Sequence, residues 1–260
     1  MSTSGRRTTH LADLTSPEVS ALLSGSSPVA ALLPVGSVEP HGPHLPLATD
    51  TILSESAAEK AVPLLSEKGI TALVVPSIPY GVTNFAEGFA GAVTLPAEAL
   101  TSFLKTVIAA YLQAGFAHVC LVNNHLEPAH DAAVRASIST FPPGKTSVAC
   151  PLTRRWGRTL SAEFKSGACH AGRYETSLVL AAAAHLVHAT SAAVLPEVNV
   201  SLSDGIRAGK HTFIEMGMTH AYAGAPALAT KEEGQDLYSA LAAMVAGEVL
   251  DALRPAGEST

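Results

Sequence analysis

The seven residues Val29-Ala-Ala-Leu-Leu-Pro-Val35 form an unbroken apolar run that Gly36 closes. A run of this length without alternating polar residues is typical of a strand buried on both faces, as in parallel sheets. Short apolar runs elsewhere predict three more strands, at Thr71–Val75, His118–Val122 and Ser147–Cys150. We therefore expect a central sheet of buried strands.

Segments with apolar residues at helical spacing alternate with these runs. The predicted helices are Ser16–Leu23, Thr51–Leu65, Pro96–Ala114, Pro128–Thr140, Glu175–Val187 and Glu232–Leu253. This alternation predicts an α/β fold with a mostly parallel sheet covered by helices on both faces. The stretch Val198–Thr230 has little periodicity, and no element is predicted there.

The chain of 260 residues is long enough for one domain with a sizeable core, because 47% of its residues are hydrophobic. Residues 1–26 are polar and rich in Ser and Thr, and we expect them to precede the domain. A single domain is predicted over residues 27–254, and residues 255–260 are expected to be a frayed tail.

Charge and composition disfavour several classes of function. The net charge is −6 and no cluster of Lys or Arg exceeds two in a row, so a nucleic-acid partner is not expected. The longest apolar stretch, Leu178–Ala184, is too short to span a membrane, and no apolar segment of a secretory signal follows Met1–His10. Cys120, Cys150 and Cys169 form no CxxC pair. We therefore expect no membrane association, no disulfide framework and a cytoplasmic location.

The residues that follow the first predicted strand carry the densest chemistry. From Gly36 to Asp50 the sequence reads Gly-Ser-Val-Glu-Pro-His-Gly-Pro-His-Leu-Pro-Leu-Ala-Thr-Asp. Glu39 and His41 stand two apart, so in an extended segment they point to the same side and can address one metal site. Asp50 directly precedes a predicted helix, where it serves either as an N-cap or as a ligand. His44 suits a turn as well as a site.

A second doublet of His and Glu follows another predicted strand. His125 and Glu127 stand two apart in the segment Val122-Asn-Asn-His-Leu-Glu127. Carboxylates and imidazoles in this mixture suit Zn²⁺, Mn²⁺ or Fe²⁺. The two segments offer more ligands than one tetrahedral ion requires, whereas two ions that share a bridging Asp would use them all. Since function in parallel α/β folds collects at the carboxyl ends of strands, we expect a dinuclear site there.

The third segment, Gly167-Ala-Cys-His-Ala-Gly-Arg-Tyr-Glu-Thr-Ser177, places His170 in a loop and Glu175 at the start of a helix. A histidine beside a metal-activated water is a credible proton shuttle. Glu175 is either a further ligand or a charge that favours the helix N-terminus. Cys169 beside His170 suggests a thiol hydrolase, but neighbours in sequence seldom form a nucleophile–base pair, and an inert buried Cys is favoured.

Each of these residues has a simpler interpretation when it is taken alone. A single His in a loop rich in Pro and Gly is most often a surface residue. The combination of doublets after two strands with a third His and Glu loop favours a metal site. The sequence contains no G-x-S-x-G elbow, and Gly144-Lys-Thr146 lacks the glycine that a phosphate loop requires at Ser139.

These segments resemble the creatininase family of metal-dependent amidohydrolases. Residues 36–50 match the family pattern G-S-x-E-Q-H-G-P-H-L-P-L-x-T-D, with Pro40 in place of Gln. Further similar segments are Tyr80-Gly81 with Phe89-Ala-Gly91, His170–Ser177, which resembles H-A-G-x-x-E-T-S, and Gly224–Thr230. The resemblance extends over roughly residues 30–240.

The resemblance implies a three-layer α/β/α sandwich, assembled as a homo-oligomer and often as a hexamer, that hydrolyses C–N bonds of cyclic or linear amides. It implies two divalent metal ions per chain, whose ligands would be Glu39, His41, Asp50, His125 and Glu127. By this resemblance Asp50 bridges the ions and His170 handles the proton, while Glu175 orients His170 or contacts a metal. We expect a metal-bound hydroxide to attack a cyclic amide, a formamide or another small amide.

Departures from the family pattern bear on the substrate. The H-x-E of His125 and Glu127 matches creatininase proper, whereas many relatives carry H-G-G-N. Leu126 stands where creatininase has an aromatic residue, Ser166 stands where it has Trp, and Trp156 is at neither substrate-contacting position. Creatinine would lose its aromatic walls, so we expect a different amide substrate.

Three other functions remain open. The site resembles that of a peptidase of the mycofactocin precursor type, although the H-x-E segment differs from the usual form of that enzyme. A family member that binds a small ligand through its metals without hydrolysing it is a second alternative. The third is a metal-free thiol hydrolase built on Cys169.

Overall fold

The computed structural model describes residues 9–254. Its four-stranded sheet has the order β2-β1-β3-β4, and every pair of neighbouring strands is parallel. The strands are β1 (Val29–Val35), β2 (Thr71–Val74), β3 (His118–Asn123) and β4 (Thr146–Ala149). Each agrees with a predicted strand to within one residue at either end, so the predicted parallel sheet is confirmed.

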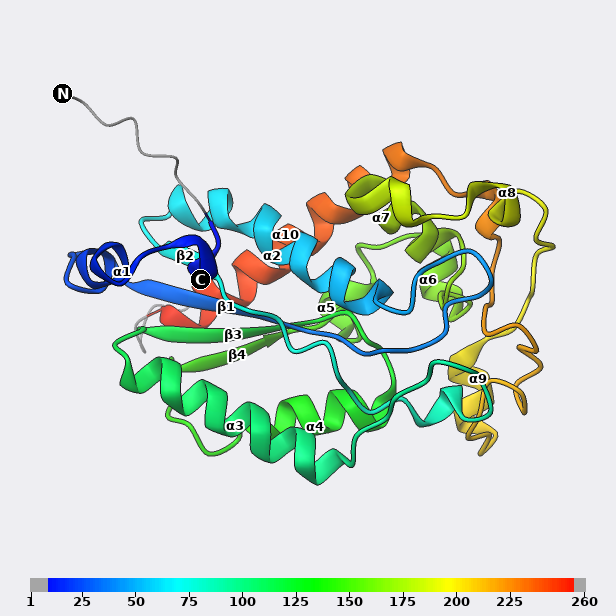
Figure 1. Cartoon of the computed structure of the whole chain (residues 1–260), viewed down its shortest axis with the longest axis horizontal. Coiled ribbons are helices and arrows are strands. Elements are labelled where there is room, and N and C mark those ends of the chain that lie inside the picture. The colour runs from blue at the N-terminus through cyan, green and yellow to red at the C-terminus, as the bar shows by residue number, and fades with distance from the viewer. Residues whose placement is uncertain (1–8, 255–260) are drawn as a thin grey trace.

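Helices cover both faces of this sheet (Figure 1). The α-helices are α1 (Ser16–Leu23), α2 (Thr49–Ser66), α3 (Ala97–Gln113), α4 (Pro128–Ile138), α5 (Arg154–Gly157), α6 (Ala162–Ser166), α7 (Arg173–Ala183), α8 (Ala189–Ala192), α9 (Leu202–Arg207) and α10 (Lys231–Leu253). Short 3₁₀ turns lie at Leu11–Asp13, Asn84–Ala86, Ala184–Leu186 and Pro226–Leu228. Helices α2, α7 and α10 form the layer on one face and α3 and α4 the layer on the other, so the three-layer α/β/α sandwich is confirmed.

The alternation of side chains along β1 explains why this strand is apolar throughout. Ala30 and Leu32 belong to the core under α2 and α10, whereas Ala31 and Leu33 belong to the core under α3 and α4. Successive side chains of a strand point to opposite faces, so a strand between two helical layers needs apolar residues at every position. Leu32 and Leu33 are fully buried. Burial of each leucine contributes about 1.5–3 kcal/mol to folding.

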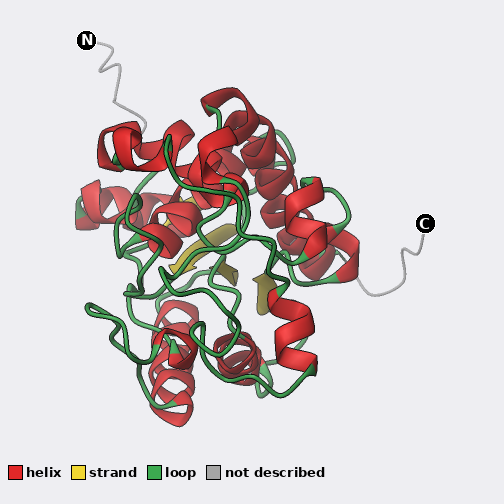
Figure 2. Ribbon diagram, turned by 90° about the vertical axis from the view of Figure 1, so that its right-hand side faces the viewer, coloured by secondary structure: helices red, strands yellow, loops and turns green. Residues whose placement is uncertain are grey.

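The segments beyond the carboxyl ends of the strands differ most from expectation. Helices α5, α6, α8 and α9 were not predicted, because helices of four to six residues carry too little periodicity to be recognised. The unassigned stretch Val198–Thr230 contains α9 and an antiparallel bridge between Val198 and Gly224. Figure 2 shows these loops and short helices in front of the ends of the strands. These loops and short helices cover the carboxyl ends of the strands, where the candidate site residues lie.

Two helix starts matter for the site. Helix α2 begins at Thr49 with Ala48 as its N-cap residue, so the interpretation of Asp50 as an N-cap is wrong. Helix α7 begins at Arg173, which places Glu175 in its first turn.

Two further expectations concern the ends of the chain and the membrane. The predicted frayed tail at 255–260 and the first eight residues of the polar N-terminal segment lie outside the described residues. Among residues 9–254, no helix combines the length and apolar character needed to cross a membrane.

Candidate metal centre

The acid and histidine side chains gather where β1 and β3 end. Glu39 and His41 follow β1, and His125 follows β3. These two strands are neighbours in the sheet, so the loops that leave their carboxyl ends meet. The first turns of α2 and α7 bring Asp50 and Glu175 to the same place. All five side chains are buried.

Two triads of possible ligand atoms share one carboxylate. Glu39, Asp50 and His125 form the first triad, and His41, Asp50 and Glu175 form the second. Within each triad the ligand atoms lie within 4.8 Å of one another. Asp50 Oδ2 is 3.1 Å from His125 Nδ1, and Asp50 Oδ1 is 3.3 Å from His41 Nε2. The two oxygens of Asp50 therefore face different triads, as a bridging carboxylate requires.

Backbone carbonyls fix which nitrogen each histidine directs at Asp50. His41 Nδ1 is 2.9 Å from the carbonyl oxygen of Glu39, and His125 Nε2 is 2.7 Å from that of Val82. A carbonyl only accepts hydrogen bonds, so these nitrogens donate, and in the neutral form of each ring the opposite nitrogen carries the lone pair. Buried His41 Nε2 has no hydrogen-bond partner. A metal ligand anchored by its second ring nitrogen has this arrangement.

Burial and mutual charge perturb every titratable group of the two triads. Burial acts to lower the pKa of His41 and His125, but nearby carboxylates outweigh it and raise both pKa values to about 10. Burial acts to raise the pKa of Asp50, but the two histidines hold it well below the usual range. Burial raises the pKa of Glu39 and raises that of Glu175 to about 8. A protein without metal thus holds protons where cations would bind.

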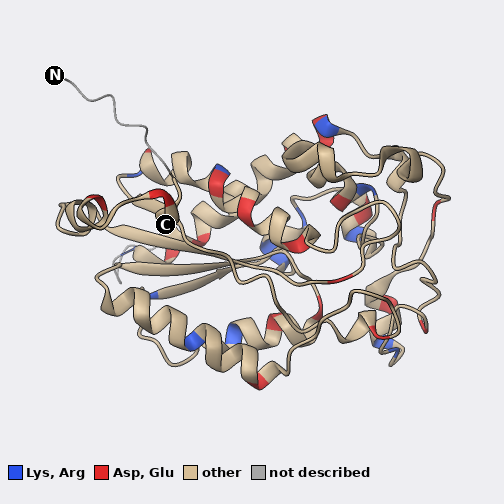
Figure 3. Cartoon of the chain, viewed as in Figure 1, with Lys and Arg blue, Asp and Glu red and all other residues tan. Residues whose placement is uncertain are grey.

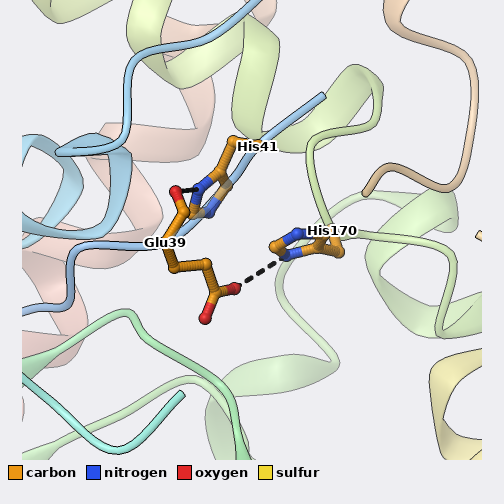
Figure 4. Close-up of side chains that lie close together, drawn as sticks. All are labelled: Glu39, His41 and His170. Atoms are coloured by element: carbon orange, nitrogen blue, oxygen red, sulfur yellow. Dashed lines mark hydrogen bonds and ion pairs between the residues drawn. The ribbon is translucent and has the colours of Figure 1, made fainter. Parts of the chain in front are cut away.

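His170 lies beside both Glu39 and His41, and its ring centre is 4.5 Å from that of His41 (Figure 4). Its Nδ1 is 3.4 Å from Glu39 Oε1, and its Nε2 donates to the carbonyl oxygen of Pro40 at 3.0 Å. Burial and the charge of His41 hold the pKa of His170 well below its usual value. The imidazole is therefore neutral at pH 7 and its Nδ1 lone pair faces the site. Glu39, His41 and His170 also form a third possible ligand group.

Glu127 lines a cavity above the two triads, and its carboxylate is held by backbone N–H groups. Its carboxylate oxygens accept the backbone N–H groups of Asn84 and Phe85, each at 3.1 Å. Glu127 belongs to none of the three ligand groups found among residues 9–254, whereas Glu175 completes one of them. The carboxylate of Glu175 also accepts the N–H of Ala171 at 2.6 Å.

Several supporting residues were not found from the sequence. Ser37 Oγ donates to Asp50 Oδ2 at 2.6 Å, and Thr83 Oγ1 donates to Glu39 Oε2. Ser37 lies within the motif at residues 36–50 and its role could have been suspected, but no sequence signal singles out Thr83. His44 bonds Thr176 at 2.8 Å, and it belongs to none of the ligand groups among the described residues.

A cavity of about 390 Å³ opens above the two triads. Phe85, Phe164 and Phe213 line it, and the ring of Phe213 lies 4.3 Å from that of His170. Trp156 instead donates to Glu248 at 2.5 Å. The aromatic surface of the cavity therefore comes from phenylalanines that the sequence analysis did not identify.

Cys169 lines the same cavity but lacks the features of a nucleophile. Its side chain is partly buried, and burial, with the charges of Glu175 and Glu163, raises the pKa of the thiol. The thiolate is the reactive form of cysteine, so this thiol is poorly suited to attack at neutral pH.

Comparison with known proteins identifies related chains. The family model described as "Creatininase: Creatinine amidohydrolase" matches residues 12–249. A mycofactocin precursor peptide peptidase from Mycobacterium tuberculosis is 29% identical over 238 residues, which cover 85% of this chain and 84% of that protein. A 3-dehydro-scyllo-inosose hydrolase from Thermotoga maritima is 30% identical over 149 residues, which cover 57% of this chain and 45% of that protein.

Solved structures share the fold. The structure titled "Creatininase Mn" superposes with a TM-score of 0.69, covers 96% of this chain and 100% of that chain, and is 21% identical. The alignment covers nearly the whole of both chains, so the similarity is one of the overall fold.

Proposed function

The chain belongs to the creatininase family, and on this basis we propose that it is a hydrolase in which a dinuclear metal centre cleaves a C–N amide bond. The observation that carries the proposal is the position of Asp50, whose two oxygens face two separate ligand triads. The side chains of the two triads also suit metal ions. Buried carboxylates, and imidazoles whose second ring nitrogen is anchored, are ligands that Zn²⁺, Mn²⁺ or Fe²⁺ accept.

The proposed ligands divide between the two ions. Glu39 and His125 would hold one ion, His41 and Glu175 would hold the other, and Asp50 would contact both. Bound ions would polarise an amide carbonyl and lower the pKa of a water molecule. Glu175 thus replaces Glu127 in the ligand set that the resemblance implied.

We assign proton transfer to Nδ1 of His170. This nitrogen carries a lone pair, because Nε2 donates to the carbonyl of Pro40. It faces Glu39 at 3.4 Å and can take a proton from the attacking water and return it to the departing nitrogen. Phe213 packs against the ring and excludes water from that side.

Replacing His170 by Ala is expected to lower kcat by about 10²–10⁴-fold while the metal content stays at the wild-type level. The reason is that the variant removes the proton carrier and leaves both proposed triads intact. We would measure kcat together with metal per chain, with the exposed His220→Ala as control. If the His170→Ala variant lost an ion, His170 would have to be a metal ligand, as the third possible ligand group of Glu39, His41 and His170 allows.

Metal affinity is expected to rise with pH. In the metal-free protein the pKa values of His41 and His125 are about 10, so both histidines are protonated at neutral pH. Each must lose its proton to bind a cation, so protons compete below pH 10 and the competition weakens as pH rises. The carboxyl group of Glu175, with a pKa of about 8, is also largely protonated at pH 7, so release of about three protons per chain is expected. Calorimetry of Mn²⁺ binding in buffers with different heats of ionisation measures this number, and an affinity independent of pH would contradict the ligand assignment.

The proposed activity is tested on lactams, formamides and short peptides with the metal-loaded enzyme. We expect hydrolysis of at least one small amide that a chelator abolishes and added Mn²⁺ or Zn²⁺ restores. Hydrolysis that persists in chelator and is lost in Cys169→Ser would contradict the proposal. Tight binding without turnover across the panel would favour a ligand-binding function.

A peptidase is a second candidate function. It is supported by the similarity to the mycofactocin precursor peptide peptidase, which extends over 84% of that protein. The same proposed centre would serve, since a peptide bond is also a C–N amide bond. Cleavage of short peptides without cleavage of lactams or formamides would favour this candidate.

A further inference from the structure

Three cationic side chains share one wall of the cavity above the metal centre. Arg154 begins α5, Arg158 directly follows that helix, and Lys165 lies on α6. All three line the cavity, and all three are exposed. Figure 3 marks Lys and Arg on both of these short helices. The chain as a whole is acidic, with a net charge of −6, so such a grouping is not a consequence of composition.

None of the three cations is paired with a carboxylate among residues 9–254. Their neighbour Arg155 differs, because it reaches Asp251 at 2.5 Å and Glu248 at 4.0 Å and lies over the ring of Trp156. Arg155 therefore fastens α5 to α10. The three cations of the cavity wall have no such structural role.

The carboxylates at the base of the cavity do not need these cations as partners. Glu39 and Asp50 face His125, Glu175 faces His41, and Glu127 accepts backbone N–H groups. Two divalent ions in the proposed centre would balance the four acidic charges. The positive charge of the wall is then available to a ligand.

Most of the remaining lining of the cavity is apolar, although Thr153 and Ser203 also contribute to it. Its apolar lining residues include Phe85, Leu126, Leu152, Ile206 and Phe213. A volume of about 390 Å³ accommodates a molecule of modest size or the end of a short peptide. A fitting ligand therefore has an apolar body and one anionic end.

We propose that Arg154, Arg158 and Lys165 form a subsite for an anionic group of the substrate, which is a carboxylate or a phosphate. Guanidinium groups bind both anions through paired N–H donors. The inference rests on the proposed function and names its substrate class: an amide with an apolar body and an anionic end that lies away from the bond cleaved.

Three hydroxamates of equal chain length test the subsite. Their hydroxamate end binds a dinuclear metal centre, and their other end is a methyl, a carboxylate or a phosphonate group. Dissociation constants for the metal-loaded protein are measured by calorimetry, without reference to turnover. We expect the anionic probes to bind at least about tenfold more tightly than the neutral probe, and added salt to reduce the difference. The tighter of the two anionic probes distinguishes a carboxylate substrate from a phosphate substrate.

The triple variant Arg154→Gln/Arg158→Gln/Lys165→Gln is expected to reduce this preference to less than about threefold. Its affinity for the neutral probe and its metal content should match the wild type, which shows that the fold and the centre are intact. Lys105→Gln is the control, because it removes an exposed cation of α3 that does not line the cavity.

Two outcomes would overturn the inference in distinguishable ways. If all three probes bind equally to the wild type, the metal centre stands and the anionic subsite is wrong. If none of the probes binds, the proposed function fails and the subsite fails with it. An undiminished preference in the triple variant would show that other groups hold the anion.

Discussion

Replacing Asp50 by Asn is expected to abolish the binding of both metal ions and to lower amide hydrolysis by about three to four orders of magnitude. Asp50 is the one side chain shared by the triads Glu39–Asp50–His125 and His41–Asp50–Glu175. The variant keeps the size of the side chain but removes its negative charge and one carboxylate oxygen. The loss corresponds to about 4–5 kcal/mol of transition-state stabilisation.

Metal per chain and kcat/KM measured on the same preparation check this expectation. Ser37→Ala is the matched control, because it removes only the hydrogen bond to Asp50 Oδ2. We expect it to reduce metal affinity by about 10–100-fold and to leave two ions bound at saturating metal. An Asp50→Asn protein that retained two ions with wild-type affinity would rule out a bridging role.

Replacing Glu175 by Gln is expected to remove one of the two ions and to lower turnover by about 10³-fold, whereas Glu127→Gln retains both. Glu175 Oε2 is 3.6 Å from His41 Nε2 in the second triad. Glu127 instead accepts the backbone N–H groups of Asn84 and Phe85. Glutamine keeps an acceptor for one of these N–H groups and loses the other hydrogen bond, so a loss of turnover of less than about tenfold, near 1.4 kcal/mol, is expected.

The pair of variants distinguishes the ligand set proposed from the structure from the one that the resemblance implied. Both are isosteric replacements at buried positions, so differences in size do not complicate the comparison. Loss of an ion from Glu127→Gln with two ions retained in Glu175→Gln would restore Glu127 as the ligand. Thermal unfolding of each metal-free variant shows whether the fold is preserved.

The sheet was predictable because its physical signal is strong. Strands buried between two helical layers must be apolar at every position, and Val29–Val35 is such a run. The resemblance to the creatininase family, inferred from the motif at residues 36–50, is confirmed by the match over residues 12–249. Glu39, His41 and His125 were expected to meet because they follow strands, and the parallel pairing of β1 with β3 brings them together.

The position of Glu175 beside His41 and Asp50, on which its proposed ligand role rests, was not predictable from the sequence. Spacing alone favours Glu127, which stands two residues from His125 as Glu39 does from His41. This position depends on long-range packing, because α7 contacts α2 and α10 and its first turn thereby lies beside Asp50. Backbone N–H groups some forty residues away in sequence take up the carboxylate of Glu127.

The grouping of cationic residues along the cavity could not be predicted from the sequence either. Arg154, Arg158 and Lys165 lie on or beside helices of four and five residues, which leave no periodic pattern. Contacts between residues far apart in sequence, such as that of Arg155 with Asp251, join α5 to α10. Short helices are positioned by contacts with residues far away in sequence. A site built on them is therefore visible only in the folded structure.

The number of metal ions per chain tests the central claim most directly. Elemental analysis of protein purified without added metal or chelator is expected to find about two equivalents of Zn, Mn or Fe per chain. The same analysis of Asp50→Asn is expected to find almost none. A wild-type protein that contains no metal, and takes up none when Zn²⁺, Mn²⁺ or Fe²⁺ is added, would contradict the dinuclear centre and the hydrolysis proposed for it.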